Sequence, residues 1–186
     1  MENIERVEEL VKMAVDGDAR SFAELYESLY KDLYKAALYT LGNPHDAENV
    51  VGDTALDAFV GIGKLRDPKN FRAWIFRILS NKCNRYIREY VKTREMVSEV
   101  SFDDVLGVSE AGSDTIKSIE DKSIIEQAFS VLSSEEKEIV TMTVYGGLDS
   151  NEIASAMNIN RNTVRSKYSR ALRKMRQFLG GDANDR

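Results

Sequence analysis

The chain has 186 residues, 42% of them hydrophobic and 31% charged, and its net charge is −5, which together fit a soluble globular protein able to bury a core. No apolar run approaches the ~20 residues of a membrane helix, and the N-terminus lacks a signal-peptide pattern. A single cysteine, Cys83, excludes an internal disulfide, so we expect a cytoplasmic protein without membrane insertion.

Helical periodicity runs through the first half of the chain. It predicts helices over residues 4–15, 22–41, 44–62 and 71–93. Ser21 and Glu24 have the spacing of a capping box for the second helix, and Pro44 suits the first turn of the third. The third helix is expected to bury Phe59 with its other apolar residues. These four helices predict a first domain over residues 1–95.

The second half begins with a segment that lacks periodicity and is rich in Ser, Gly and Asp. We expect a flexible acidic linker over residues 96–117, followed by a second small domain over residues 118–186. Helices are predicted over residues 118–131, 133–145, 150–157 and 161–179. Ser133 and Glu136 again have capping-box spacing. No stretch indicates strands, so the predicted fold class is all-α.

The last two predicted helices, joined by a turn at residues 158–160, form a helix-turn-helix. Seven Lys or Arg and no carboxylate lie between positions 161 and 176. The apolar face is expected to hold Val164, Tyr168, Leu172, Met175 and Leu179. The opposite face is suited to duplex DNA, because Arg and Asn can contact base edges and Lys can contact phosphates. A solvated basic helix is the less favoured alternative.

A second basic stripe runs along the helix over residues 71–93. Arg77, Asn81, Arg85 and Arg88 recur every three or four residues, and on pattern alone a solvated face and a nucleic-acid face are equally supported. Residues 46–53 form an acidic helix face, for which solvation is the simpler interpretation.

Nothing in the sequence predicts catalysis. His45 is the only histidine, and there is neither a glycine-rich phosphate loop nor a Cys/His metal cluster. We therefore expect no enzyme activity and no cofactor.

Three segments carry a family resemblance: "FAELYESLYKDLYKAALYTLGNPHDAENVVGDTALDAF", "FRAWIFRILSNKCNRYIRE" and "LSSEEKEIVTMTVYGGLDSNEIASAMNINRNTVRSKYSRALRKMRQFL". Over about residues 20–90 and 125–179 the chain resembles the extracytoplasmic-function class of bacterial sigma factors. The resemblance implies a promoter-specificity subunit that binds core RNA polymerase and promoter DNA, both duplex and single-stranded. It also implies that an anti-sigma factor inhibits the protein.

The resemblance assigns roles to named positions. The polymerase clamp helices would be contacted by Asp46, Glu48, Asn49 and Asp53. The −10 element would be contacted by Lys64, Arg66, Lys69, Asn70, Arg77, Asn81, Arg85 and Arg88. The −35 element would be contacted by Arg161, Asn162, Thr163, Arg165, Ser166, Lys167, Ser169 and Arg170.

The sequence departs from the family pattern at a few positions. Asn49 and Gly52 replace an Asp and a Gln of the docking motif, and Arg85 stands where an acidic residue is common. An alternative function is a stand-alone helix-turn-helix regulator whose N-terminal half is a sensor or dimerisation domain. The basic stripe and the "FRAWIFRILSN" helix favour the sigma factor, because a sensor domain needs neither.

Overall fold

The computed structural model describes residues 2–97 and 124–180, and all regular elements within these ranges are helical. The helices are α1 (Glu2–Val15), α2 (Ala19–Leu41), α3 (Pro44–Gly61), α4 (Phe71–Val97), α6 (Ser134–Val144), α7 (Ser150–Met157) and α8 (Arg161–Phe178). Two 3-10 turns, η1 (Ile62–Lys64) and η2 (Pro68–Asn70), join α3 to α4, and residues 124–130 are also helical. The all-α prediction is confirmed. Of the predicted linker, residues 98–117 lie outside the described ranges.

The helix starts follow the capping chemistry of the sequence, with one exception. The predicted Ser133–Glu136 box is present: the Ser133 hydroxyl accepts from the Glu136 backbone N–H (3.3 Å), and the Glu136 carboxylate accepts from the Ser133 N–H (2.9 Å). The Ser21–Glu24 box is wrong, because α2 begins earlier and is capped by Asp18. The Asp18 carboxylate accepts from the Ser21 N–H and hydroxyl, so an ionised acceptor takes the place of the predicted serine.

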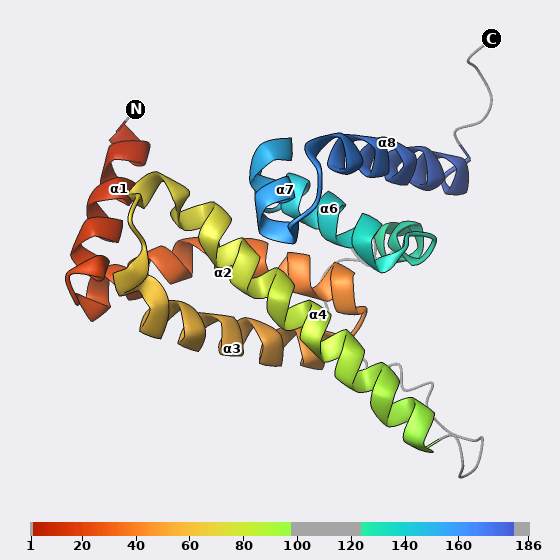
Figure 1. Ribbon diagram of the computed structural model, residues 1–186, viewed down its shortest axis with the longest axis horizontal. Helices are drawn as coiled ribbons and strands as arrows, with labels where there is room; N and C mark the ends of the chain where they lie inside the picture. The colour runs from red at the N-terminus through yellow and green to blue at the C-terminus, as the bar shows by residue number, and fades with distance from the viewer. Residues whose placement is uncertain (1, 98–123, 181–186) are drawn as a thin grey trace, which may run out of the picture.

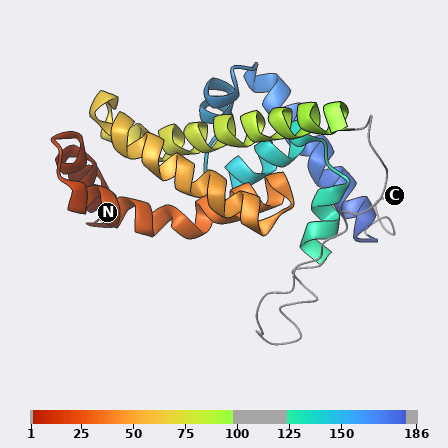
Figure 2. The same ribbon diagram turned by 90° about the horizontal axis from the view of Figure 1, so that it is seen from below.

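The N-terminal unit, α1 to α4, and the C-terminal unit, residues 124–180, pack against each other (Figure 1). In this view α6, α7 and α8 lie on one side of α2 and α4, and α3 lies on the other side. Figure 2 shows α1 at the opposite end of the molecule from the end of α8. Buried Phe76 of α4 belongs to the same apolar cluster as Met142 of α6 and Ile153 of α7. The two units therefore share a core.

Three apolar residues predicted to face the core are exposed, Phe59, Leu172 and Leu179, and the last of them is 56% exposed just after the end of α8. Phe59 is 46% exposed, and its ring meets the Phe22 ring edge on at 5.2 Å between centroids. Its neighbour Ala58 is fully buried, so Phe59 points about 100° around the helix from the core. On α8, Ala171 is fully buried and the adjacent Leu172 is 42% exposed for the same reason. Small residues, not the larger neighbours, face the core at both positions.

Candidate nucleic-acid interface

The helix-turn-helix is built from side-chain caps on both of its helices. Asp149 caps α7 by accepting from the Asn151 and Glu152 N–H groups at 2.6 and 2.9 Å, and the Glu152 carboxylate accepts in return from the Asp149 N–H at 2.7 Å. Asn158 ends α7 in the left-handed region with φ 55°. Asn160 then caps α8 by accepting from the Asn162 N–H at 2.8 Å. The predicted three-residue turn therefore joins two separately capped helices.

A tight turn precedes this motif, and it depends on Gly146. A Cβ at this position would lie 2.3 Å from the Met142 carbonyl oxygen, a distance that no side chain tolerates. Gly147 follows with φ 62°, and Leu148 is buried. The glycine pair thus turns the chain from α6 into α7, as the sequence indicates. Gly146 is required because a side chain would clash there, and Gly147 is favoured because its φ is positive.

The exposed face of α8 carries most of the residues predicted to read DNA. Val164 and Ala171 are buried against the rest of the unit, and they fix which side of the helix faces outward. Thr163 is half-buried. The exposed members of the predicted set are Arg161, Asn162, Arg165, Ser166, Ser169 and Arg170. They occupy the start of the helix, where a major-groove reader presents its base-contacting side chains.

Lys167 lies apart from this set. Its ammonium group is paired with the Glu135 carboxylate of α6, and 24% of its side chain is exposed. Two turns farther along α8, Lys174 donates to Glu136 at 2.7 Å. Burial raises the pKa of Glu136, but the hydrogen bonds from Lys174 and Ser133 outweigh this effect and lower it overall. The two lysines thus attach α8 to α6, a role that α8 alone does not reveal in the sequence.

The second predicted DNA surface is also exposed. Arg77, Asn81, Arg85 and Arg88 are exposed along α4, and the loop residues Lys64, Arg66, Lys69 and Asn70 are exposed beside its start. Asp67 orders this loop by accepting from the Lys69 N–H and the Asn70 amide, both at 3.1 Å. Gly61 allows Trp74 to approach, because a Cβ there would lie 3.3 Å from the indole ring. The basic residues therefore project from an ordered turn and one helix face.

The acidic face of α3 lies next to this basic stripe. Glu48, Asn49 and Asp53 are exposed, whereas Asp46 is half-buried and accepts a hydrogen bond from Tyr86, which raises the pKa of that phenol to about 12. Asp53 lies 3.9 Å from Arg85 and 4.0 Å from Lys82. The predicted docking surface and the predicted −10 surface therefore meet at Asp53, which neither helix face predicts by itself.

Exposed apolar side chains extend the acidic face of α3, and the sequence analysis missed them. Leu56 is 66% exposed and Val60 is 83% exposed. They lie three and seven residues after Asp53, so all three share one side of the helix. A signal for them is present in the sequence. Leu56 and Val60 form an apolar i, i+4 pair, and neither belongs to the buried residues of α3.

The described residues give no sign of a membrane span or a metal centre. No helix in residues 2–97 or 124–180 combines the length and apolar character needed to cross a bilayer. In the same ranges, no three His, Cys, Asp or Glu side chains gather as metal ligands would.

Two family models match the chain, one for each helical unit. Residues 25–93 match Sigma-70 region 2, and residues 122–175 match Sigma-70 region 4. The chain is 26% identical to the ECF RNA polymerase sigma factor SigW of Bacillus subtilis (strain 168) over 186 residues, covering 93% of this chain and 96% of SigW.

Two solved structures share the fold. The first is CnrH in complex with the cytosolic domain of CnrY, with a TM-score of 0.70, 22% identity, and coverage of 96% of this chain and 99% of that one. The second is the sigma factor RpoE in complex with the anti-sigma factor NepR from Bartonella quintana, with a TM-score of 0.71, 20% identity, and coverage of 89% and 100%.

Proposed function

The chain belongs to the extracytoplasmic-function class of RNA polymerase sigma factors, and from this premise we propose how its helices divide the work of promoter recognition. Its function is promoter recognition as a subunit of RNA polymerase, and the stand-alone regulator is not favoured, since the matches cover both helical units. We assign residues 1–95 to polymerase docking and the −10 element, residues 118–186 to the −35 element, and residues 96–117 to the connection between them.

The start of α8 reads the −35 element. The observation that carries this assignment is an exposed helix face without a carboxylate, directly after a capped three-residue turn. Arg161, Asn162 and Arg165 take the base edges, because Arg and Asn form bidentate contacts with guanine and adenine. Ser166, Ser169 and Arg170 follow along the same face, and Thr163 and Lys167 lie at its edge.

The loop before α4 and the exposed stripe of α4 bind the −10 element, including its separated strand. Lys64, Arg66, Lys69 and Asn70 supply charge and amide donors on the loop, and Arg77, Asn81, Arg85 and Arg88 continue them along the helix. Extruding a base from a duplex costs a few kcal/mol, which phosphate contacts from these side chains offset.

The outer face of α3 docks on the clamp helices of the largest polymerase subunit. Its polar contacts come from Asp46, Glu48, Asn49 and Asp53, and Leu56 adds the exposed apolar surface that a protein interface buries at its centre. A charged ring around an apolar contact is the arrangement of a specific, reversible protein interface.

The remaining assignments follow from the family. The chain acts in the cytoplasm, where the polymerase is, and it catalyses no reaction of its own. An anti-sigma factor inhibits it; this proposal is supported by the resemblance to RpoE, which was solved with the anti-sigma factor NepR.

Run-off transcription with purified core polymerase tests the function. We expect promoter-dependent transcripts only when the chain is added, and we expect them to disappear when either promoter element is scrambled. A chain that binds duplex DNA tightly alone but confers no promoter-dependent initiation would establish the regulator instead.

A further inference from the structure

We infer that Glu135 of α6 competes with DNA for the recognition helix α8. Its carboxylate occupies the Lys167 ammonium group, which is then not available to a DNA phosphate at the edge of the DNA-facing side of α8. Glu135 thereby lowers the affinity of the chain for any duplex without changing which bases it prefers. The inference rests on the proposed function, because it requires that α8 face duplex DNA.

Lys167 lies at the border between the buried side and the exposed side of α8. It is four residues after Thr163 and three residues before Arg170, so these residues are its neighbours on the helix surface. Arg170 is exposed, whereas only 24% of the Lys167 side chain is exposed, because its ammonium group pairs with Glu135. A lysine is a flexible point charge suited to phosphates. Lys167 is thus placed to contact a phosphate, but an internal anion already binds it.

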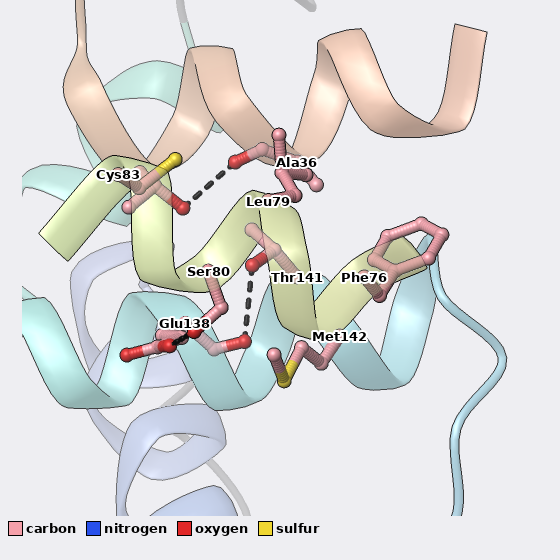
Figure 3. A pocket seen from close by; sticks show the side chains of 9 residues that line it. Ala36, Phe76, Leu79, Ser80, Cys83, Glu138, Thr141 and Met142 are labelled. Atoms are coloured by element: carbon pink, nitrogen blue, oxygen red, sulfur yellow. Dashed lines mark hydrogen bonds between the residues drawn. The ribbon is translucent and has the colours of Figure 1, made fainter. Parts of the chain in front are cut away.

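The other carboxylates near the start of α6 have structural partners. Glu136 is buried and completes the cap of this helix. Glu138 is 6% exposed and faces α4, where it accepts hydrogen bonds from the Ser80 hydroxyl and from the Asn84 amide at 3.1 and 3.2 Å. Figure 3 shows Glu138 and Ser80 facing each other at a pocket between α4 and α6. Buried carboxylates require such partners, so both of these residues belong to the packing of the fold.

Glu135 differs from both of these residues. Its side chain is 61% exposed, and the capping box uses the Glu136 carboxylate instead. α6 lies beside α8 (Figure 1), so Glu135 reaches Lys167 at the surface where the two helices meet. An ion pair at such an exposed position adds little to stability. The main effect of the Glu135 charge is therefore on the availability of Lys167.

A phosphate must displace Glu135 before it can bind Lys167. The carboxylate belongs to the same folded unit, so its effective concentration at the ammonium group is at least roughly millimolar. A phosphate on the same ammonium group would also lie within about 8–10 Å of the Glu135 carboxylate, the range over which two negative charges repel each other at physiological salt. Both effects oppose the phosphate, so Lys167 stays paired and one DNA contact is missing.

The missing contact has a defined consequence for DNA binding. Each phosphate contact releases counterions and contributes about −0.9 to the slope of log affinity against log salt concentration. Phosphate contacts carry no sequence information, so Glu135 weakens binding to random and promoter duplexes by the same factor. Weak binding to random DNA keeps the free chain available to the polymerase.

Fluorescence anisotropy of the full chain with a short labelled duplex of random sequence tests the inference. Glu135→Gln keeps the shape of the side chain and removes its charge. We expect this variant to bind about three- to tenfold more tightly near 0.1 M salt, and its salt slope between about 50 and 200 mM to steepen by about 0.9, because Lys167 gains a phosphate contact. Glu126→Gln is the matched control: Glu126 is an exposed carboxylate in the same unit, and its removal should leave the slope unchanged.

Two further variants identify the route of the effect. Adding Lys167→Gln to Glu135→Gln should remove both the gain in affinity and the added slope, because no ammonium group is left to bind the phosphate. Arg165→Ala should weaken duplex binding, which reports directly on contact between α8 and DNA. Circular dichroism checks that each variant keeps its helices.

The inference is overturned if helical Glu135→Gln binds the duplex as weakly as the wild type or more weakly, or if its tighter binding survives Lys167→Gln. In these cases a clear loss of binding in Arg165→Ala leaves the DNA assignment of α8 standing. If Arg165→Ala also binds as the wild type does, α8 does not contact the duplex, and the inference and the −35 assignment fail together. Tighter binding by Glu135→Gln in a chain that supports no run-off transcription would refute the proposed function and leave the inference standing.

Discussion

Replacing Glu138 by glutamine keeps the shape of the side chain and removes its titration. Burial raises the pKa of the wild-type carboxyl to about 7; hydrogen bonding from Asn84 opposes the shift and the charge of Glu135 adds to it. Cys83 of α4 also faces this region, and the charge of Glu138 contributes to its raised thiol pKa. The ordinary pKa of the group is 4.5, and the carboxyl returns to it when water reaches the site.

The sign of the effect follows from proton binding. Between pH 4.5 and 7 the folded wild type binds more protons at Glu138 than the unfolded chain does, so the protein loses stability through this site as pH rises through that window. The difference between 7 and 4.5, at 1.36 kcal/mol per pKa unit, corresponds to about 3 kcal/mol. Above pH 7 the loss is complete, and below pH 4.5 it is absent.

Glutamine does not lose a proton in this range. The stability of the Glu138→Gln variant should therefore lack the pH-dependent loss that the carboxyl causes in the wild type. At pH 5 we expect Glu138→Gln and the wild type to differ by less than about 1 kcal/mol, because a protonated carboxyl and an amide offer one acceptor and one donor group each. At pH 8 the variant should be more stable by about 2–3 kcal/mol. Urea unfolding at both pH values, followed by circular dichroism, measures the difference directly.

The comparison between the two proteins cancels every other titrating group. Glu126→Gln is the matched control, because Glu126 is an exposed carboxylate in the same unit, and its difference from the wild type should not change between pH 5 and pH 8. If the difference between Glu138→Gln and the wild type is also the same at both pH values, the buried carboxylate does not govern the packing of the units, and the reasoning fails.

Three further predictions follow from the DNA, docking and turn residues. Arg165→Ala should weaken −35 binding by about 1–3 kcal/mol and change base preference there, measured with promoter variants in the assembled polymerase; an unchanged preference would limit Arg165 to phosphate contact. Asp53→Ala should reduce affinity for core polymerase without lowering thermal stability by more than about 1 kcal/mol, because the Asp53 side chain is exposed, its ion pairs are long at 3.9 and 4.0 Å, and Lys82 keeps its closer pair with Asp57 at 2.6 Å. Gly146→Ala should lower unfolding stability by more than about 2 kcal/mol, whereas Gly52→Ala, which meets open space, should not; equal effects would contradict the steric argument.

Local chemistry in the sequence predicts many of the helices well, because α2, α3, α6, α7 and α8 each begin beside a capping residue. The Ser133–Glu136 pair acts as predicted and Asn160 of the predicted turn caps α8, since a cap involves residues only two or three positions apart. Asp18 displaced the predicted Ser21 cap because two polar residues competed within one turn and spacing alone does not rank them. Helical periodicity does not distinguish Phe59 from the adjacent Ala58, so it predicts that Phe59 is buried. In the structure the smaller Ala58 faces the core and Phe59 is exposed.

The contact between the two units could not be predicted in the same way. Arg72 and Gly146 are 74 positions apart, and Glu138 and Ser80 are 58 apart. Such pairs leave no periodic signal, and Glu138 alone looks like one more acidic residue on an amphipathic helix. The sequence shows only that Glu138 directly precedes the apolar pair Ile139 and Val140. The structure shows that both of these neighbours are buried.

The same long-range pairing separates the roles of the basic residues on α8. Lys167 and Lys174 neutralise Glu135 and Glu136 of α6, so two of the seven positive charges in this segment hold the unit together. Arg161, Arg165 and Arg170 remain exposed on the outward face. Arg forms planar bidentate contacts that Lys cannot form, so the residues best suited to base edges are the ones left facing solvent. A chain with a net charge of −5 can therefore present a localised DNA surface, because α6 acids pair with the lysines at the side of that surface and leave its arginines exposed.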